Sequence, residues 1–438
     1  MTDAVAQTAP TTTPPPRRSA TSLLRSFEVD TRLLGMAIAL VVIWIGFNIW
    51  SDGLFMSPRN LWNLSVQTSA VAVMATGMVL IIVSRNIDLS VGSLVGVLGM
   101  SMAILQARLI PNTFGLGFEQ PYTWIVTVGF GLGLGAALGV LSGVLVAYVG
   151  IPSFVVTLGG LLVWRAVTII LSAGQTVSQL DPTYTLLGGG PKGSVGDTVS
   201  WILGALVCVA IVYGLISSRR RRRRYGFPVR PWPAEVAIGA IGCAIVLWAV
   251  WIANSYPWPK ALATQYAAER GIVEPEGGLI IATGIANPVL IMLGVGALMT
   301  ILATRRRLGR YVFAIGGNPE AADLSGINTR RIILWTFVIM GVLAAVSAVI
   351  STARLQSATS GSGTGLELQV IAAAVIGGTS FAGGIGTIPG AILGALIIQS
   401  LVSGMQLLRF DNSVVDIAVG VVLVVAVGID TVIRRRAS

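Results

Sequence analysis

Side chains capable of acid–base, nucleophilic or metal chemistry are scarce in this chain. Its 438 residues include no histidine, which removes the commonest metal ligand and general base in proteins. The two cysteines, Cys208 and Cys243, both lie inside apolar runs, where a thiol behaves as a small hydrophobic side chain. The carboxylates are scattered along the sequence. We therefore expect no catalytic residues, no disulfide and no metal site.

The chain also lacks a sequence that could bind ATP. A phosphate-binding loop needs glycine, four residues and then Gly-Lys followed by Ser or Thr, so that backbone amides cradle the phosphates while the lysine reaches them. The nearest stretch, 188–194, reads Gly-Gly-Gly-Pro-Lys-Gly-Ser. It fails because Gly193 follows Lys192 and no strand is expected before it. We predict no cofactor in this chain, so an ATP-driven function would require a separate ATPase chain.

The most informative polar stretch is the connection 304–331. Within it Asn318 suits a helix N-cap, Pro319 suits the first helical position, and Glu320 would lie against the positive end of the helix dipole. Gly326 can adopt the left-handed conformation that ends a helix. These signals predict a two-turn helix that begins at Pro319. It is either an ordinary capped loop helix or a surface on which a partner docks.

The composition indicates that most of the molecular surface lies in a lipid bilayer. Hydrophobic residues make up 54% of the chain and charged residues only 11%, whereas soluble domains carry roughly 25% charged residues. The mean hydropathy is +0.83. We expect an all-α polytopic transmembrane helical bundle that forms one domain over 31–433. A polar, proline-rich and disordered tail over 1–30 precedes it, and a short C-terminus over 434–438 follows it.

Candidate spans follow from length, because about 20 apolar residues are needed to cross the hydrocarbon core as a helix. The candidates are approximately 33–50, 61–84, 88–106, 123–149, 153–173, 199–217, 234–253, 279–303, 332–353, 366–381, 384–408 and 414–433. Polar or glycine-rich breaks interrupt 88–106 and 366–408, so either could be re-entrant. The sequence thus predicts about 10 to 12 helices, some broken or re-entrant, with the first one uncleaved.

Arginines gather in the short connections of this net +11 chain. The clusters lie at 219–224, 305–310, 330–331 and 434–436. Such clusters favour the cytoplasmic side of a membrane. With the N-terminus inside, alternate crossings place all four clusters on one side. This pattern predicts a multi-pass protein of the bacterial inner membrane with both termini and the loops 218–233 and 304–331 in the cytoplasm. It does not favour binding to nucleic acid.

Two breaks in the apolar pattern are similar to each other. In 78–93 and again in 370–386, an apolar helix is followed by a polar kink and a stretch of small residues. Many transporters are built from internal repeats whose broken helices lie near the substrate site. Glycines also simply allow helices to approach closely. Both interpretations of the breaks stay open.

Two ionisable residues lie within or beside apolar runs. Arg165 is in the middle of a span and Asp88 is at a helix break. A charge near the bilayer centre is costly unless it is paired or hydrated, so such side chains face the bundle interior. Asp88 either caps the following helix or contacts a transported solute. Arg165 either forms a structural ion pair or contacts that solute.

Several motifs resemble those of sugar permeases from ATP-binding-cassette (ABC) importers. Glu320-Ala321-Ala322, with Gly326 four residues on, resembles the EAA loop of such permeases. The wider pattern is similar to the ribose/xylose-type members over roughly 33–433. The similar segments, in chain order, are IDLSVGS at 87–93, PSFVVTLG at 152–159, AIGGN at 314–318 and IGGTS at 376–380 with the glycines that follow to 386.

The resemblance implies an all-helical permease that pairs as a homodimer, binds two copies of an ABC ATPase and accepts sugar from a periplasmic sugar-binding protein. ATP and Mg would be held by the ATPase. The connection 219–230 and its flanking spans are more similar to xylose-type than to ribose-type permeases, which makes a pentose the first choice of substrate. The region 254–278 departs from the pattern and looks like an extra periplasmic insert. The implied coupling residues are Asn318, Pro319, Glu320, Ala321, Ala322 and Gly326.

The sequence therefore predicts a transport subunit that moves a monosaccharide across the membrane and is not an enzyme. The alternative is an ion-coupled secondary sugar transporter. A neutral sugar needs hydrogen-bond partners along its path, and Asn63 and Gln67 are four residues apart and so share a helix face. The candidate path residues are Asn63, Gln67, Asp88, Thr157, Arg165, Thr379 and Ser380.

Overall fold

The chain folds almost entirely into helices, which confirms the predicted all-α class. The computed structural model describes residues 31–273, 275 and 278–437, so the tail predicted over 1–30 and Ser438 lie outside the described residues. The long elements are α2 (Thr31–Trp50), α3 (Pro58–Val83), α4 (Val91–Ile104), α5 (Thr123–Val144), α6 (Ser153–Ser172), α8 (Gly196–Arg224), α9 (Trp232–Asn254), α11 (Asn287–Arg305), α14 (Thr329–Leu355), α16 (Ile388–Leu407) and α17 (Asn412–Ala437). The shorter elements are the π-helical turns η1 (Leu105–Thr113) and η2 (Leu145–Val149), the 3-10 turn η3 (Leu186–Gly188), α7 (Pro182–Thr185), α10 (Lys260–Arg270), α12 (Arg307–Gly317), α13 (Pro319–Leu324), α15 (Leu366–Ile376), β1 (Val177–Ser178) and β2 (Ser357–Ala358).

Ten of the described helices are long and apolar enough to cross a membrane. They are α2, α3, α4 with η1, α5 with η2, α6, α8, α9, α11, α14 and α16. Two shorter apolar helices are α15 and the stretch Asn412–Gly428 of α17. The prediction of a polytopic bundle with interrupted helices is confirmed. The two interruptions are the loop 84–90 between α3 and α4 and the loop 377–387 between α15 and α16.

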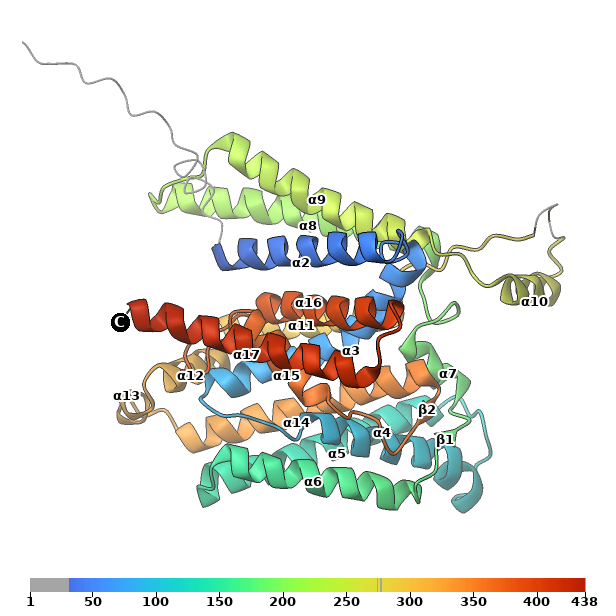
Figure 1. The fold of residues 1–438 in the computed structure, drawn as a ribbon, viewed down its shortest axis with the longest axis horizontal. Helices are drawn as coiled ribbons and strands as arrows, with labels where there is room; N and C mark the ends of the chain where they lie inside the picture. Colours follow the sequence, from blue (N-terminus) through green and yellow to red (C-terminus); the bar gives the residue numbers. More distant parts are fainter. Residues whose placement is uncertain (1–30, 274, 276–277, 438) are drawn as a thin grey trace, which may run out of the picture.

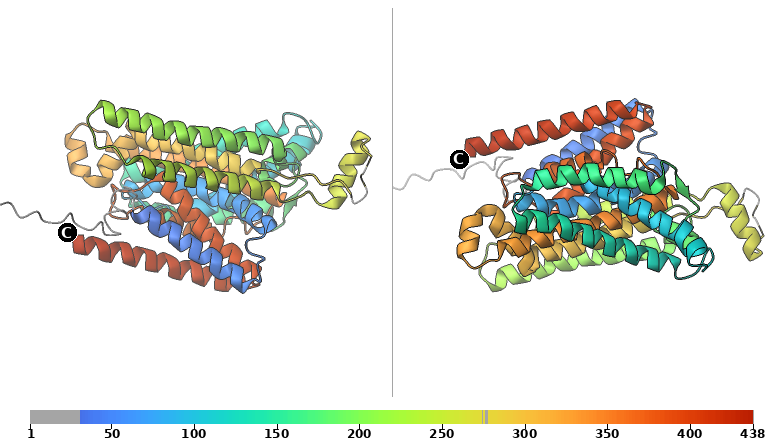
Figure 2. Two further views of the ribbon diagram at one scale, coloured as in Figure 1. Left: turned by 90° about the horizontal axis from the view of Figure 1, so that it is seen from above. Right: turned by 90° about the horizontal axis from the view of Figure 1, so that it is seen from below.

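The helices run roughly side by side, so the bundle has two ends (Figure 1 and Figure 2). At one end lie α12, α13, the connection from α8 to α9 and the C-terminal end of α17, whereas α10 projects from the other end. The clusters at 219–224, 305–310 and 330–331 are in or beside connections at the α13 end, and the cluster at 434–436 is at the C-terminal end of α17 on the same side. The clusters therefore share one end of the bundle, as alternate crossings require.

Helix α3 forms the centre of the bundle and buries side chains on every face. It packs against α11, α14, α15 and α16, and 89% of its apolar stretch is buried, against 11% for α6 and α8. Because a helix that is apolar all round is stable only inside a protein or a membrane, this position suits its sequence. The outer helices, among them the α8–α9 hairpin, leave most of their apolar surface exposed.

Helices α5 and α14 approach each other through small residues. A methyl group on Gly135 of α5 would collide with the carbonyl oxygen of Gly341 in α14, and one on Gly139 would lie 2.5 Å from the carbonyl oxygen of Phe337. Small residues at helix interfaces allow such backbone approach in membranes. The glycines of α5 therefore set the spacing of these two helices.

Two predicted segments have other bounds in the structure, and a third contains a helix that was not predicted. The loop predicted over 218–233 shrinks to a connection over 225–231, because α8 continues through its arginines to Arg224 and arginine is a good helix former. The span predicted over 279–303 begins only at Asn287, since the preceding residues form isolated bridges such as that between Pro257 and Ala282. The insert predicted over 254–278 contains the separate helix α10.

We predict that Gly135→Leu destabilises the bundle, because the new side chain must push α5 away from α14. Overpacking of a dense core costs roughly 1–3 kcal/mol, so the thermal unfolding midpoint of the purified protein in detergent should fall. Gly133→Leu is the matched control, since nothing lies within 4 Å of a methyl group there. Equal unfolding midpoints for the two variants would contradict the close approach of the helices.

Candidate functional site

A cavity of about 200 Å³ lies among α3, α4, α14 and α15. This volume is below the range of roughly 300–1,000 Å³ that is typical of drug-sized ligand pockets, so the cavity suits a small solute. Its polar lining residues are Gln67, Ser351, Thr352, Arg354, Ser362, Thr364 and Gln369. The apolar lining residues are Val66, Ala70, Val95, Ile350, Leu355 and Leu366, with Gly363 between them. The lining contains no carboxylate.

Helix ends and one glycine-rich loop place these side chains. Helix α14 ends at the cavity, where Gln356 adopts a left-handed conformation as the C-cap. The loop 359–365 folds back on itself, with the Ser362 hydroxyl accepting a 3.1 Å hydrogen bond from the Thr359 backbone N–H. Gly363 has φ +79° and lies so close to α4 that a methyl group would collide with the carbonyl oxygen of Gly92. The loop therefore lies flat on α4 and presents Ser362 and its neighbours to the cavity.

Hydrogen bonds orient the polar groups of the cavity. The side-chain amide of Gln399 donates a 2.7 Å hydrogen bond to the amide oxygen of Gln369, so the NH₂ group of Gln369 can serve as a donor to a further partner. The hydroxyls of Tyr184 and Thr352 are 2.7 Å apart, and Thr352 also donates to the carbonyl oxygen of Ala348. The result is a mostly neutral, hydrogen-bonding cavity with one guanidinium, that of Arg354.

The predicted path residues do not all reach this cavity. Gln67 lines it, whereas Asn63, one turn earlier on α3, is not among the lining residues. Arg165 lines a neighbouring pocket of about 10 Å³ together with Glu367. That volume is enough for about one water molecule, and the two opposite charges share it. This placement favours an electrostatic structural role for Arg165.

The other predicted path residues belong to the two interruptions. The carboxylate of Asp88 accepts hydrogen bonds from the backbone N–H (2.9 Å) and the hydroxyl (2.6 Å) of Ser90. The N-cap of α4 is Ser90 itself, so Asp88 shapes the turn before the helix. The hydroxyl of Thr157 donates to the carbonyl oxygens of Ser153 (2.9 Å) and Ile87 (3.2 Å), which ties α6 to the loop 84–90.

In the loop 377–387, the hydroxyl of Ser380 accepts a 3.2 Å hydrogen bond from the backbone N–H of Ala382. The hydroxyl of Thr379 is buried and has no hydrogen-bond partner among the described residues. Thr379 and Ser380 belong to the second interruption and are not among the residues that line the cavity with Gln67.

The two interruptions meet at the end of α12. The backbone N–H of Gly384 donates a 3.0 Å hydrogen bond to the carbonyl oxygen of Val83. The guanidinium of Arg85 donates to the carbonyl oxygens of Gly316 (2.8 Å) and Gly317 (2.9 Å). We name the set of Val83, Arg85, Gly316, Gly317 and Gly384 the junction. It lies directly before the capped helix α13.

Helix α13 has the caps that the sequence predicts. The side-chain oxygen of Asn318 accepts a 3.0 Å hydrogen bond from the backbone N–H of Ala321, and Gly326 follows the helix with φ +79°. Ala322 is buried beneath it, whereas Glu320 is exposed. Leu324 is 90% exposed, so an apolar side chain projects from the end of the bundle.

Comparison with known proteins identifies the family. The family described as branched-chain amino acid transport system / permease component matches residues 60–427. The chain belongs to this permease family. The xylose transport system permease protein XylH of Haemophilus influenzae is 37% identical over 409 residues, which cover 93% of this chain and 98% of that protein.

Two further relatives extend the comparison. The XylH protein of Escherichia coli strain K12 is 38% identical, covering 93% of this chain and 94% of that protein. The ribose import permease protein RbsC of the same strain is 31% identical over 376 residues, covering 86% of this chain and 87% of that protein. No solved structure matches the chain.

The sequence did not point to several residues of this permease that line the cavity or project from the end of the bundle. Gln369 and Arg354 lie near helix ends, and Leu324 is one more apolar residue in an apolar chain. A usable signal was present in the loop 359–365, where serine and threonine alternate with glycine at 361, 363 and 365. Such a stretch packs closely and exposes hydroxyls.

We predict that Gln67→Leu and Gln369→Leu each raise the KM for the transported solute. Each lost hydrogen bond is worth about 0.5–1.5 kcal/mol, which corresponds to about two- to tenfold. Uptake kinetics at matched membrane content provide the measurement. Asn63→Leu is the control, because it lies one turn away on the same helix and outside the cavity. If Asn63→Leu matched the effect of Gln67→Leu, the cavity would not be the site of contact.

Proposed function

We propose that this permease is the membrane-spanning subunit of an ABC importer that translocates a monosaccharide, with xylose or another pentose as the substrate. The observation that carries the proposal is the match to xylose permeases at 37–38% identity over 93% of the chain, above the 31% found for the ribose permease. As a permease subunit, the chain has a transport role, and we assign ATP hydrolysis to a separate ATPase.

The chemistry of the cavity supports a sugar as the solute. Sugars present many hydroxyls and no charge, and amide and hydroxyl side chains can both donate to and accept from them. Gln67 and Gln369 supply such groups from two different helices. The absence of carboxylates from the lining disfavours a cation, and the apolar side chains around the polar groups suit the faces of a sugar ring.

The partners are proposed on the same basis. The match over nearly the whole chain supports an ATPase, a periplasmic sugar-binding protein and a second copy of this permease as partners. The exposed Glu320 and Leu324 on α13 offer an ATPase a docking surface. We assign docking of the binding protein to the opposite end, from which α10 projects (Figure 1). With this assignment of the two ends, we propose that both termini lie in the cytoplasm and α10 in the periplasm.

A reconstitution experiment separates this proposal from an ion-coupled carrier. We expect no accumulation of xylose by liposomes that contain this chain alone, whether or not a proton or sodium gradient is imposed. Uptake should require the ATPase, ATP and the sugar-loaded binding protein. Gradient-driven accumulation by the chain alone would establish the secondary transporter instead.

We predict that Gly326→Val, and to a lesser degree Glu320→Lys, leave membrane insertion intact but reduce ATPase association and sugar-stimulated ATP hydrolysis. Nothing lies within 4 Å of a methyl group at Gly326, so the effect should come from its φ of +79°, where a side chain costs roughly 1–2 kcal/mol. Glu320→Lys removes a favourable interaction with the helix dipole of about 0.3–1 kcal/mol. Co-purification of the ATPase and sugar uptake are measured together.

Two control variants isolate the backbone effect. Gly326→Asn should behave like the unmodified chain, because asparagine tolerates the left-handed conformation. Ser325→Val places the same valine side chain next door, at φ −80°, at the loss of the hydrogen bond from the Ser325 hydroxyl to the carbonyl oxygen of Ala321, and should retain most of the ATPase association. If Gly326→Val purified with a normal amount of ATPase and transported normally, α13 would have no part in coupling.

A further inference from the structure

The hairpin of α8 and α9 stands on the outside of the bundle (Figure 1). Only 11% of the apolar stretch of α8 and 22% of that of α9 is buried. Val212 and Ile216 of α8 and Val236 of α9 are 43–50% exposed. Within a bilayer, these side chains contact lipid.

A groove of about 380 Å³ runs between the two helices at the end of the hairpin. Its walls follow helical spacing, so each helix contributes one face. The lining residues are Val212, Leu215, Ile216 and Arg219 of α8, and Trp232, Glu235, Val236, Gly239, Ala240 and Cys243 of α9. A methyl group on Gly239 would lie 3.1 Å from Leu215, so this glycine keeps the floor of the groove open.

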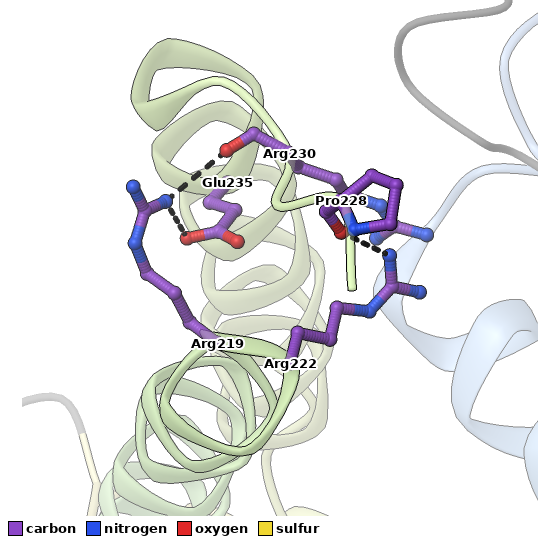
Figure 3. A network of polar contacts seen from close by, with 5 residues as sticks. All are labelled: Arg219, Arg222, Pro228, Arg230 and Glu235. Carbon is purple, nitrogen blue, oxygen red and sulfur yellow. Dashed lines mark hydrogen bonds and ion pairs between the residues drawn. The ribbon is translucent and has the colours of Figure 1, made fainter. Parts of the chain in front are cut away.

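A polar network closes the groove at the connection 225–231. The guanidinium of Arg219 donates to the carboxylate of Glu235 (2.5 Å) and to the carbonyl oxygen of Arg230 (3.2 Å), as Figure 3 shows. It also lies 5.2 Å from the ring centre of Trp232. Arg222 donates to the carbonyl oxygen of Pro228 (3.4 Å). The turn is thus fixed against both helices.

Positive charge surrounds this end of the groove. Between 217 and 243 the sequence contains seven arginines and one carboxylate, Glu235, and Glu235 already binds Arg219. Arg220, Arg221, Arg223 and Arg224 are exposed on the last turns of α8. We call these four the arginine collar.

Aromatic side chains lie close to the arginine collar in the sequence. Trp232, Tyr225 and Phe227 are 62–66% exposed, and tryptophan and tyrosine are enriched where a membrane protein passes from hydrocarbon to headgroups. The groove therefore ends at the level of Trp232, and the arginine collar continues α8 beyond it.

We propose that the α8–α9 groove binds one anionic phospholipid, with an acyl chain in the groove and the phosphate against the arginine collar. The apolar lining fits a hydrocarbon chain but gives no preference for the headgroup. The preference comes from the collar, because guanidinium groups bind phosphate oxygens in bidentate fashion and basic clusters next to a span attract acidic lipids. A zwitterionic lipid would gain only the groove contacts.

The test uses the full-length chain with dioleoyl phosphatidylglycerol and dioleoyl phosphatidylcholine, whose acyl chains are identical. Native mass spectrometry after detergent exchange should show one phosphatidylglycerol retained in preference to phosphatidylcholine. Replacing the four collar arginines with glutamine should lower that preference about tenfold or more. Ala240→Trp, which fills the groove and keeps the collar, should reduce retention of both lipids.

A second arginine cluster supplies the matched control. Arg305, Arg306 and Arg307 are also exposed at the end of a spanning helix, and their replacement with glutamine should leave lipid retention unchanged. Photocrosslinking with a diazirine-bearing acyl chain should label 212–243. An unchanged preference in the collar variant, an equal loss in the control variant, or retention of both lipids by Ala240→Trp would each overturn the proposal.

Discussion

Backbone hydrogen bonding is the constraint on which this bundle depends. Inside hydrocarbon every peptide N–H and C=O must find a partner within the protein, and an uninterrupted helix meets that demand by itself. Two loops within the bundle, 84–90 and 377–387, cannot pair all their backbone groups by themselves. They satisfy each other and their neighbours instead, through the bond from Gly384 to Val83 and those from Arg85 to the end of α12. The hydrogen bonds of the junction thus pair backbone groups that hydrocarbon would leave without partners. They also hold the two loops together.

The junction also connects two distant regions. Helix α3 carries Gln67 at the cavity and ends at Val83 in the junction, while α15 carries Gln369 and leads into the loop 377–387. The helix that precedes α13 ends at the same point. Packed helices thus connect the junction, which lies next to α13, to the walls of the cavity.

The sequence predicted features that depend on local physics. Apolar length located the spans, and Asn318, Pro319 and Gly326 located α13 and both its ends, because caps act within a few residues. Features that depend on contacts between distant segments were not predictable. The alignment of Gln67 with Gln369, separated by about 300 residues, requires knowledge of how α3 packs on α15. The end of α8 was also missed, since a run of arginines interrupts the apolar pattern without interrupting the helix.

The central position of α3 has a consequence for biosynthesis. Its neighbours α14, α15 and α16 are encoded after residue 328, whereas α3 leaves the ribosome second among the described helices. Contacts of such sequence separation form late, and an incomplete chain exposes surfaces that the finished one buries. Helix α3 therefore lacks most of its final neighbours until α14, α15 and α16 have been synthesised. A chain that stops before α14 lacks the helices against which α3 packs, so the core of the bundle cannot form.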